Sequence, residues 1–84
     1  MKRYCITFRS VTYAQRGEQV LRRRGLECTM QRAPRSMSDR GCSYCLRLRP
    51  AEALQAVEAL RQDGAMFSGL FTMDDAGHVE ELPV

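Results

Sequence analysis

The sequence predicts an α+β fold in which two helices pack on one face of a four-stranded antiparallel sheet. The first reason is periodicity: runs with the two-residue period of a strand and runs with helical spacing follow one another as strand, helix, strand, twice over. The second is an internal similarity, because Tyr4-Cys5-Ile6 recurs as Tyr44-Cys45-Leu46 and both helical patterns stop at a glycine. The length of 84 residues is that of one small domain.

The first half of the chain contains a strand, a helix and a second strand, over residues 3–9, 11–24 and 26–32. Ser10 or Thr12 can cap the start of the helix, because each hydroxyl can accept a hydrogen bond from a free backbone N–H. Gly25 ends it, since glycine adopts the left-handed conformation of a helix stop. Gly17 lets the helix lie close to the sheet. The apolar face of this helix consists of Ala14, Val20 and Leu21.

The second half repeats this order, with a strand over 43–49, a helix from 50 to 64 and a strand over 66–73. Pro50 begins the helix. Proline lacks a backbone N–H, and in the first turn of a helix that N–H would have no partner within the helix. The apolar stripe of the helix consists of Ala53, Leu54, Val57 and Leu60. The segment between the halves is rich in turn formers and predicts a loop. We expect a single domain over residues 1–73, and an acidic tail or a short hairpin extension over 74–84.

Two right-handed crossovers put both helices on one face of the sheet and the first and third strands in its centre, which is the ferredoxin-like βαββαβ sandwich. One face of the sheet is then expected to be buried beneath the helices and the other to be open. The expected buried set is Tyr4, Ile6, Phe8, Tyr44, Leu46 and Leu48. By alternation, the open face displays Cys5, Thr7, Arg9, Cys45, Arg47 and Arg49.

The formal net charge of +3 hides an asymmetry along the chain. Residues 1–49 carry twelve Lys and Arg side chains against three carboxylates, a net charge of +9, whereas residues 50–84 carry one arginine against seven carboxylates, a net charge of −6. No apolar run approaches the roughly 20 residues of a membrane span. Met1-Lys2-Arg3 leads directly into a strand rather than into an apolar leader. We therefore expect a cytoplasmic protein without a membrane segment.

Four cysteines in so short a chain suggest disulfides, a zinc site or a reactive thiol. Cys42 and Cys45 have CxxC spacing, but structural zinc needs four convergent ligands and the remaining candidates form no second pair. A thioredoxin-type pair lies at the start of a helix, whereas this one lies at the entry to a strand. The sequence therefore predicts neither a metal nor a cofactor. His78 is expected to be structural or solvated.

Cys42 differs from the other cysteines. Cys45 repeats Cys5 at mid-strand, and Cys28 falls on the expected core face of the second strand, whereas Cys42 has no counterpart in the first half. Nearby arginines and backbone N–H donors lower the pKa of a thiol and favour the nucleophilic thiolate. Cys42 is therefore a candidate carrier or nucleophile, against the plainer interpretation of a small apolar residue at a strand end. The groups that could bind its sulfur are Arg35, Ser38, Arg40, Gly41 and Ser43.

The chain resembles the selenium/sulfur carrier-like family of small proteins from Tyr4 to about Phe71. The motifs that carry the resemblance are Thr7-Phe8-Arg9-Ser10, the helix stop Leu21…Gly25-Leu26, and Pro34-Arg35…Ser38…Cys42 followed by Leu46-Arg47-Leu48. The resemblance implies a cysteine that holds sulfur or selenium as a persulfide or selenopersulfide, and Cys42 is the matching position. Ser43 stands where glycine is usual, and the preceding loop is one residue longer.

On this hypothesis the protein is a carrier rather than a stand-alone enzyme. A donor such as a cysteine desulfurase loads Cys42, and an acceptor protein, which the sequence does not identify, receives the atom. Arg35, Arg40 and Ser38 would hold the anionic persulfide, and the docking surface would be Arg9, Arg47 and Arg49.

Three alternatives stay open. In the first, Cys42 and Cys45 serve thiol redox or metal-handling chemistry, with Cys45 as a resolving thiol. In the second, the basic face binds RNA; we do not expect this, because the predicted open face carries no aromatic side chain on which bases could stack. In the third, the open sheet face is the contact of a homodimer.

Overall fold

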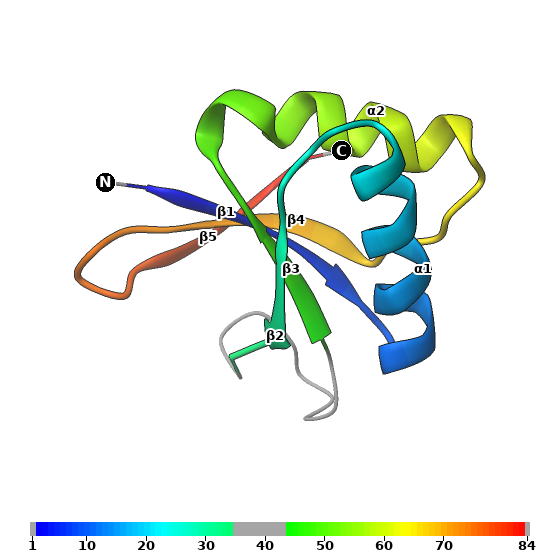
Figure 1. Ribbon diagram of the computed structural model, residues 1–84. Helices are drawn as coiled ribbons and strands as arrows, with labels where there is room; N and C mark the ends of the chain where they lie inside the picture. The colour runs from blue at the N-terminus through cyan, green and yellow to red at the C-terminus, as the bar shows by residue number, and fades with distance from the viewer. Residues whose placement is uncertain (1, 35–43, 84) are drawn as a thin grey trace.

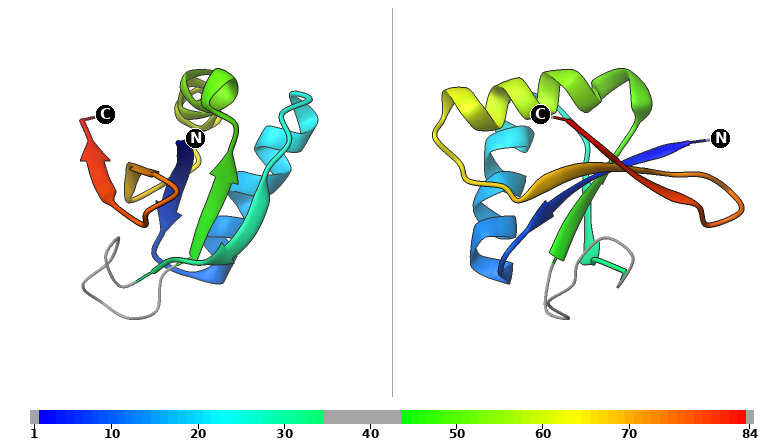
Figure 2. Two further views of the ribbon diagram at one scale, coloured as in Figure 1. Left: turned by 90° about the vertical axis from the view of Figure 1, so that its left-hand side faces the viewer. Right: turned by 180° about the vertical axis from the view of Figure 1, so that it is seen from behind.

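The computed structural model describes residues 2–34 and 44–83. These residues form an α+β structure with two helices and a five-stranded antiparallel open sheet of order β2-β3-β1-β4-β5 (Figure 1). The elements are β1 (Arg3–Phe8), α1 (Val11–Arg23), β2 (Thr29–Arg32), β3 (Tyr44–Leu48), the 3₁₀ turn η2 (Pro50–Glu52), α2 (Ala53–Gln62), β4 (Gly69–Met73) and β5 (Val79–Leu82). Both helices lie on the same side of the sheet, as predicted (Figure 2).

The sheet has five strands rather than the predicted four, because the C-terminal segment, expected as an acidic tail or a short hairpin extension, adds a strand. β5 pairs with β4 through a register that sets Phe71 opposite Glu81 and Met73 opposite Val79. The first four strands keep the ferredoxin-like order, with β1 and β3 in the centre. The result is a roughly ferredoxin-like sheet that is extended by one strand at the β4 edge.

Two strands start later than predicted, and the helix stops explain why. After α1 the backbone N–H of Leu26 donates to the carbonyl of Leu21 at 2.9 Å, and after α2 the N–H of Ala65 donates to Leu60 at 2.9 Å. These bonds belong to the closing turn of each helix. Leu26 and Ala65 thus belong to the helix stops, and β2 and β4 begin at 29 and 69 rather than at 26 and 66.

The two helix stops are equivalent and are joined to each other. Gly25 and Gly64 have φ values of +75° and +68°, the left-handed conformation predicted for both. The Arg24 guanidinium beside the first stop donates to Gln62 Oε1 at 2.8 Å and to Asp63 Oδ1 at 2.9 Å beside the second. The internal similarity of the sequence thus corresponds to two helix ends that contact each other.

The helix α1 starts at the first of the two predicted caps. Ser10 is the N-cap, and its Oγ accepts a hydrogen bond of 3.4 Å from the backbone N–H of Tyr13. Gly17 faces the sheet, as predicted, and a Cβ at this position would lie 2.6 and 2.8 Å from two ring carbons of Phe8. The absence of a side chain therefore permits the close contact between α1 and β1.

The core between the helices and the sheet contains most of the expected residues. From the strands it takes Ile6, Phe8, Leu46 and Leu48, and from the helices Ala14, Val20, Leu21, Val57 and Leu60. Tyr4 and Tyr44 are only partly buried at its edge. The prediction for Leu54 is wrong, because its side chain is 78% exposed, and Ala56 and Ala59 are buried on α2.

The second face of the sheet is not open, which corrects the prediction for three of its residues. Cys5, Thr7 and Cys45 are buried. The sheet is strongly twisted (Figure 2), and on this face Cys5 and Cys45 form a small cluster with Phe71, Ala33, Met73 and Val79. Two of these covering residues come from β4 and one from β5. Because the sheet is twisted and carries an added strand, the middle of this face is covered. Alternation alone predicted that this face is exposed to solvent.

Candidate functional site

Two of the predicted site residues belong to the part of the chain that the structure describes, and the others do not. Cys45 and Arg47 lie on β3. The remaining predicted site residues, Arg35, Ser38, Arg40, Gly41, Cys42 and Ser43, lie outside the described residues. β3 begins at Tyr44, two positions after Cys42, so the described strands fix where the candidate loop joins the sheet.

Cys45 is fully buried beside a second thiol. It lies opposite Thr7 of β1 and opposite Gln31 of β2, and it shares a small buried cluster with Cys5. The neighbouring Cys5 side chain, followed by burial, raises the pKa of the Cys45 thiol above its ordinary value. The role of resolving thiol for Cys42 stays a prediction.

The surroundings of Cys5 favour its thiolate form. The neighbouring Cys45 side chain lowers the pKa of Cys5 below its ordinary value, and the positive charges of Arg47 and Arg3 act in the same direction against the effect of burial.

Arg47 lies toward the far end of β3 and lines a basic pocket of about 640 Å³. The only carboxylate that lines the described pocket is Glu27, whose Oε2 accepts a hydrogen bond of 2.9 Å from Arg49. The cations that line the pocket are Lys2, Arg3, Arg22, Arg47 and Arg49. The sequence predicted Arg47 and Arg49 as basic surface residues, whereas the convergence of Lys2, Arg3 and Arg22 on them requires the tertiary structure.

The docking surface expected from the sequence is therefore divided between the two ends of β3. Arg47 and Arg49 belong to the pocket at the C-terminal end of this strand. Arg9 directly follows Phe8, whose register partner is Tyr44, so it lies at the end where β3 begins. Arg32 lies at the same end, because it pairs with Tyr44 from β2. Sequence reasoning missed Arg32 because the pairing of β2 with β3 decides its position.

Cys28 is a half-buried thiol that lines the basic pocket and packs against the main core. Burial, followed by the negative charge of Glu18, raises the pKa of Cys28 above its ordinary value. This agrees with the expectation of a core-facing position. Within residues 2–34 and 44–83, no three His, Cys, Asp or Glu side chains come together as a metal site, and no helix there is long and apolar enough to cross a membrane.

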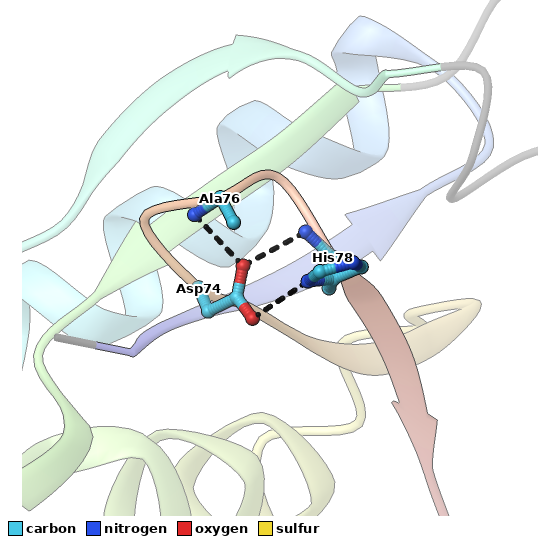
Figure 3. Close-up of polar contacts among 3 residues, drawn as sticks. All are labelled: Asp74, Ala76 and His78. Atoms are coloured by element: carbon cyan, nitrogen blue, oxygen red, sulfur yellow. Dashed lines mark hydrogen bonds and ion pairs between the residues drawn. The ribbon is translucent and has the colours of Figure 1, made fainter.

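His78 has a structural environment in the turn between β4 and β5 (Figure 3). Asp74 Oδ1 accepts hydrogen bonds from the backbone N–H groups of Ala76 and His78 at 3.0 and 2.9 Å, and Asp74 Oδ2 lies 3.1 Å from His78 Nδ1. The turn residue Gly77 has a φ of +86°. These contacts close the hairpin that carries β5.

Replacing Asp74 with alanine is expected to lower the melting temperature at neutral pH. Its hydrogen bonds to the backbone and ring of His78 lower the pKa of the Asp74 carboxyl below the ordinary value. A carboxyl with a lowered pKa stabilises the folded state above its unfolded pKa of about 4, and this contribution is lost as the pH falls through the folded value. Thermal melts of both proteins between neutral and strongly acidic pH should therefore converge on acidification. A constant difference in melting temperature would contradict this assignment.

A comparison with protein families gives a match over most of the chain. The model of the family described as "Putative Se/S carrier protein-like" matches residues 3–72. The matched range includes Cys42 and both halves of the repeat. No curated protein and no solved structure matches the chain.

Proposed function

The chain belongs to this selenium/sulfur carrier-like family, and on that premise we propose that Cys42 carries a sulfur or selenium atom and passes it to an acceptor protein. The family match, which extends over Cys42, is the observation that carries the proposal. Arg35, Arg40 and Ser38 hold the anionic persulfide, and the backbone around Gly41 and Ser43 contributes N–H donors.

The environments of the other cysteines favour Cys42 as the carrier. A thiol that exchanges an atom with another protein has to meet the partner's sulfur directly. Cys5 and Cys45 are 0% exposed, and burial raises the pKa of Cys28 and disfavours its thiolate. None of the three described cysteines therefore suits transfer between proteins.

Loading and delivery are two exchanges at the terminal sulfur. The Cys42 thiolate attacks the terminal sulfur of a persulfide on the donor, the S–S bond of the donor breaks, and the donor's cysteine leaves as a thiolate. In delivery an acceptor nucleophile attacks the same terminal sulfur, and Cys42 leaves as the thiolate. The selenopersulfide follows the same sequence with selenium as the terminal atom.

The charge of the described residues supports docking of the donor at the end of the sheet where β3 begins. Arg9 and Arg32 are exposed and flank the strand end at Tyr44. Positive side chains around a thiol favour its anionic form and attract a negatively charged partner surface. The basic pocket around Arg47 lies toward the other end of β3 and has no part in this proposal.

Intact-mass measurement of the reduced protein tests the carrier function after incubation with a cysteine desulfurase, its pyridoxal phosphate cofactor and cysteine. The wild-type protein is expected to gain the mass of one sulfur atom, which a thiol reductant removes. Cys42→Ser should gain none, because the serine hydroxyl forms no persulfide, whereas the matched variant Cys28→Ser should load like the wild type. An unchanged mass of the wild-type protein, or equal loading of Cys42→Ser, would overturn the proposal.

A further inference from the structure

The basic pocket of about 640 Å³ lies where three distant segments of the chain meet, at residues 2–3, 25–29 and 47–50. The start of β1 and the end of β3 lie side by side here, because Tyr4 pairs with Leu48 (Figure 2). The described lining residues include five cations and a single carboxylate, that of Glu27. Volumes of about 300–1,000 Å³ are typical of small-molecule sites. The pocket thus has the size and the charge of a site for an anionic small molecule.

Most of the positive charge in this pocket is not neutralised by the protein. Arg22 and Arg49 each contact a carboxylate, whereas Lys2, Arg3 and Arg47 form no ion pair with another described residue. Arg47 is also half-buried. A cation that is partly withdrawn from water without an opposite charge raises the free energy of the folded state. A bound anion supplies the missing charge.

The strand register puts hydrogen-bond donors on one face of the sheet within this pocket. Arg47 lies directly opposite Thr29 of β2 and opposite Cys5 of β1. Directly opposed residues share a face, with Cβ atoms about 4.5–5.5 Å apart. Arg3 is on the same face, because it precedes Cys5 by two residues. A guanidinium group donates two parallel hydrogen bonds to a phosphate, and the Thr29 hydroxyl can donate a further one.

We propose that this pocket binds an organic diphosphate, a small molecule with two linked phosphate groups. One phosphate group carries a charge of about −1.5 to −2 at neutral pH, so the three cations without an ion pair exceed one phosphate and match two. Leu26, Leu48 and Pro50 form an apolar part of the wall, and the organic part of the ligand packs against it. No aromatic side chain lines the described pocket, so the bases of single-stranded RNA have no stacking surface here.

The ion pair between Glu27 and Arg49 competes with this ligand. The two side chains are 78% and 70% exposed, and ion pairs at such positions contribute little to stability. Arg49 can therefore exchange the carboxylate of Glu27 for a phosphate group. Removing the charge of Glu27 should tighten binding of the diphosphate, which is the opposite of what a substitution that damages the site would do.

The test is a titration of the reduced, ¹⁵N-labelled protein with ADP in metal-free buffer of low ionic strength, followed by amide NMR. Saturable shifts are expected at residues 25–29 and 47–49. Pyrophosphate should compete with ADP, and adenosine should cause no shifts. AMP should bind about tenfold more weakly than ADP, because it lacks one charge-assisted contact. The titration needs no persulfide, so Cys42→Ser should bind ADP like the wild type, and failure of the carrier function would leave this result unchanged.

Variants of matched charge assign the binding to the pocket. Arg3→Gln/Arg47→Gln should weaken ADP binding by about tenfold or more, and Glu27→Gln should strengthen it by about two- to fivefold. Arg16→Gln/Arg61→Gln removes the same charge from exposed positions on α1 and α2 outside the pocket and should bind like the wild type.

The amide spectrum also establishes that each variant is folded. If Arg3→Gln/Arg47→Gln unfolds, Lys2→Gln/Arg3→Gln replaces it, because both of these side chains are exposed. Shifts centred on Arg9 and Arg32 at the other end of β3, or equal losses in the helix control, would overturn the proposal. Tighter binding of a short single-stranded RNA than of ADP at the same amides would also overturn it.

Discussion

Replacing Leu60 with alanine is expected to lower the free energy of unfolding by about 2–5 kcal/mol. Leu60 is 0% exposed in the core between α2 and the sheet. Removing its branched end takes away buried apolar surface and leaves a cavity that the neighbouring side chains fill only in part. Urea-induced unfolding, followed by circular dichroism, measures the difference from the wild type.

The matched control lies on the same helix. Leu54 is 78% exposed, so Leu54→Ala should change the free energy of unfolding by less than about 0.5 kcal/mol. The two substitutions remove the same atoms from the same element and differ only in burial. Equal losses at both positions, or a larger loss at Leu54, would contradict the orientation of α2 described above.

Replacing Gly17 with alanine is expected to destabilise the protein by about 1–3 kcal/mol, because the added methyl group overpacks the core. Its Cβ would lie 2.6 and 2.8 Å from ring carbons of Phe8, which is 0% exposed and is enclosed by the core. In a solvent-facing helical position the same substitution stabilises by up to about 1 kcal/mol, since alanine is the better helix former. The sign of the effect therefore reports the contact between α1 and β1.

A double-mutant cycle isolates this contact. Phe8→Leu removes the ring, and the cost of Gly17→Ala should be smaller in the Phe8→Leu background than in the wild type. The measurement is the free energy of unfolding of the four proteins. Additive effects, or stabilisation by Gly17→Ala alone, would show that the ring of Phe8 does not restrict this position.

The structure separates the cysteines into distinct chemical environments. Cys28 packs against the main core, and Cys5 and Cys45 are buried in a smaller cluster on the other face of the sheet. The family match extends over Cys42, which we propose as the carrier. On our proposal, Cys42 is the thiol that transfers an atom between proteins, and the three described cysteines have no part in that transfer.

The fold also separates the positively charged side chains of the first half of the chain into two groups. Arg9 and Arg32 lie where β3 begins, whereas Lys2, Arg3, Arg22, Arg47 and Arg49 surround the pocket toward its other end. Both groups come from the first 49 residues, which carry a net charge of +9. The strand register, rather than the composition, assigns each cation to one end of the sheet.

The sequence by itself determined the order of the elements, the helix stops and the residues that share a face. These are local properties: Gly25 and Gly64 can adopt positive φ, and alternation groups Ile6 with Phe8 and Leu46 with Leu48. The Cys42 motif and the family resemblance could also be recognised from the sequence alone.

Only the tertiary structure decided which faces are covered. Alternation tells which residues lie together, but Cys5 and Cys45 are buried because a twisted sheet and residues distant in sequence, such as Phe71 and Val79, close over them. The exposure of Leu54 depends on how α2 packs against the sheet, and the late start of β2 depends on a backbone N–H already bonded in the helix stop. Burial is a property of the whole packed chain, since covering a surface requires contacts that no local pattern specifies.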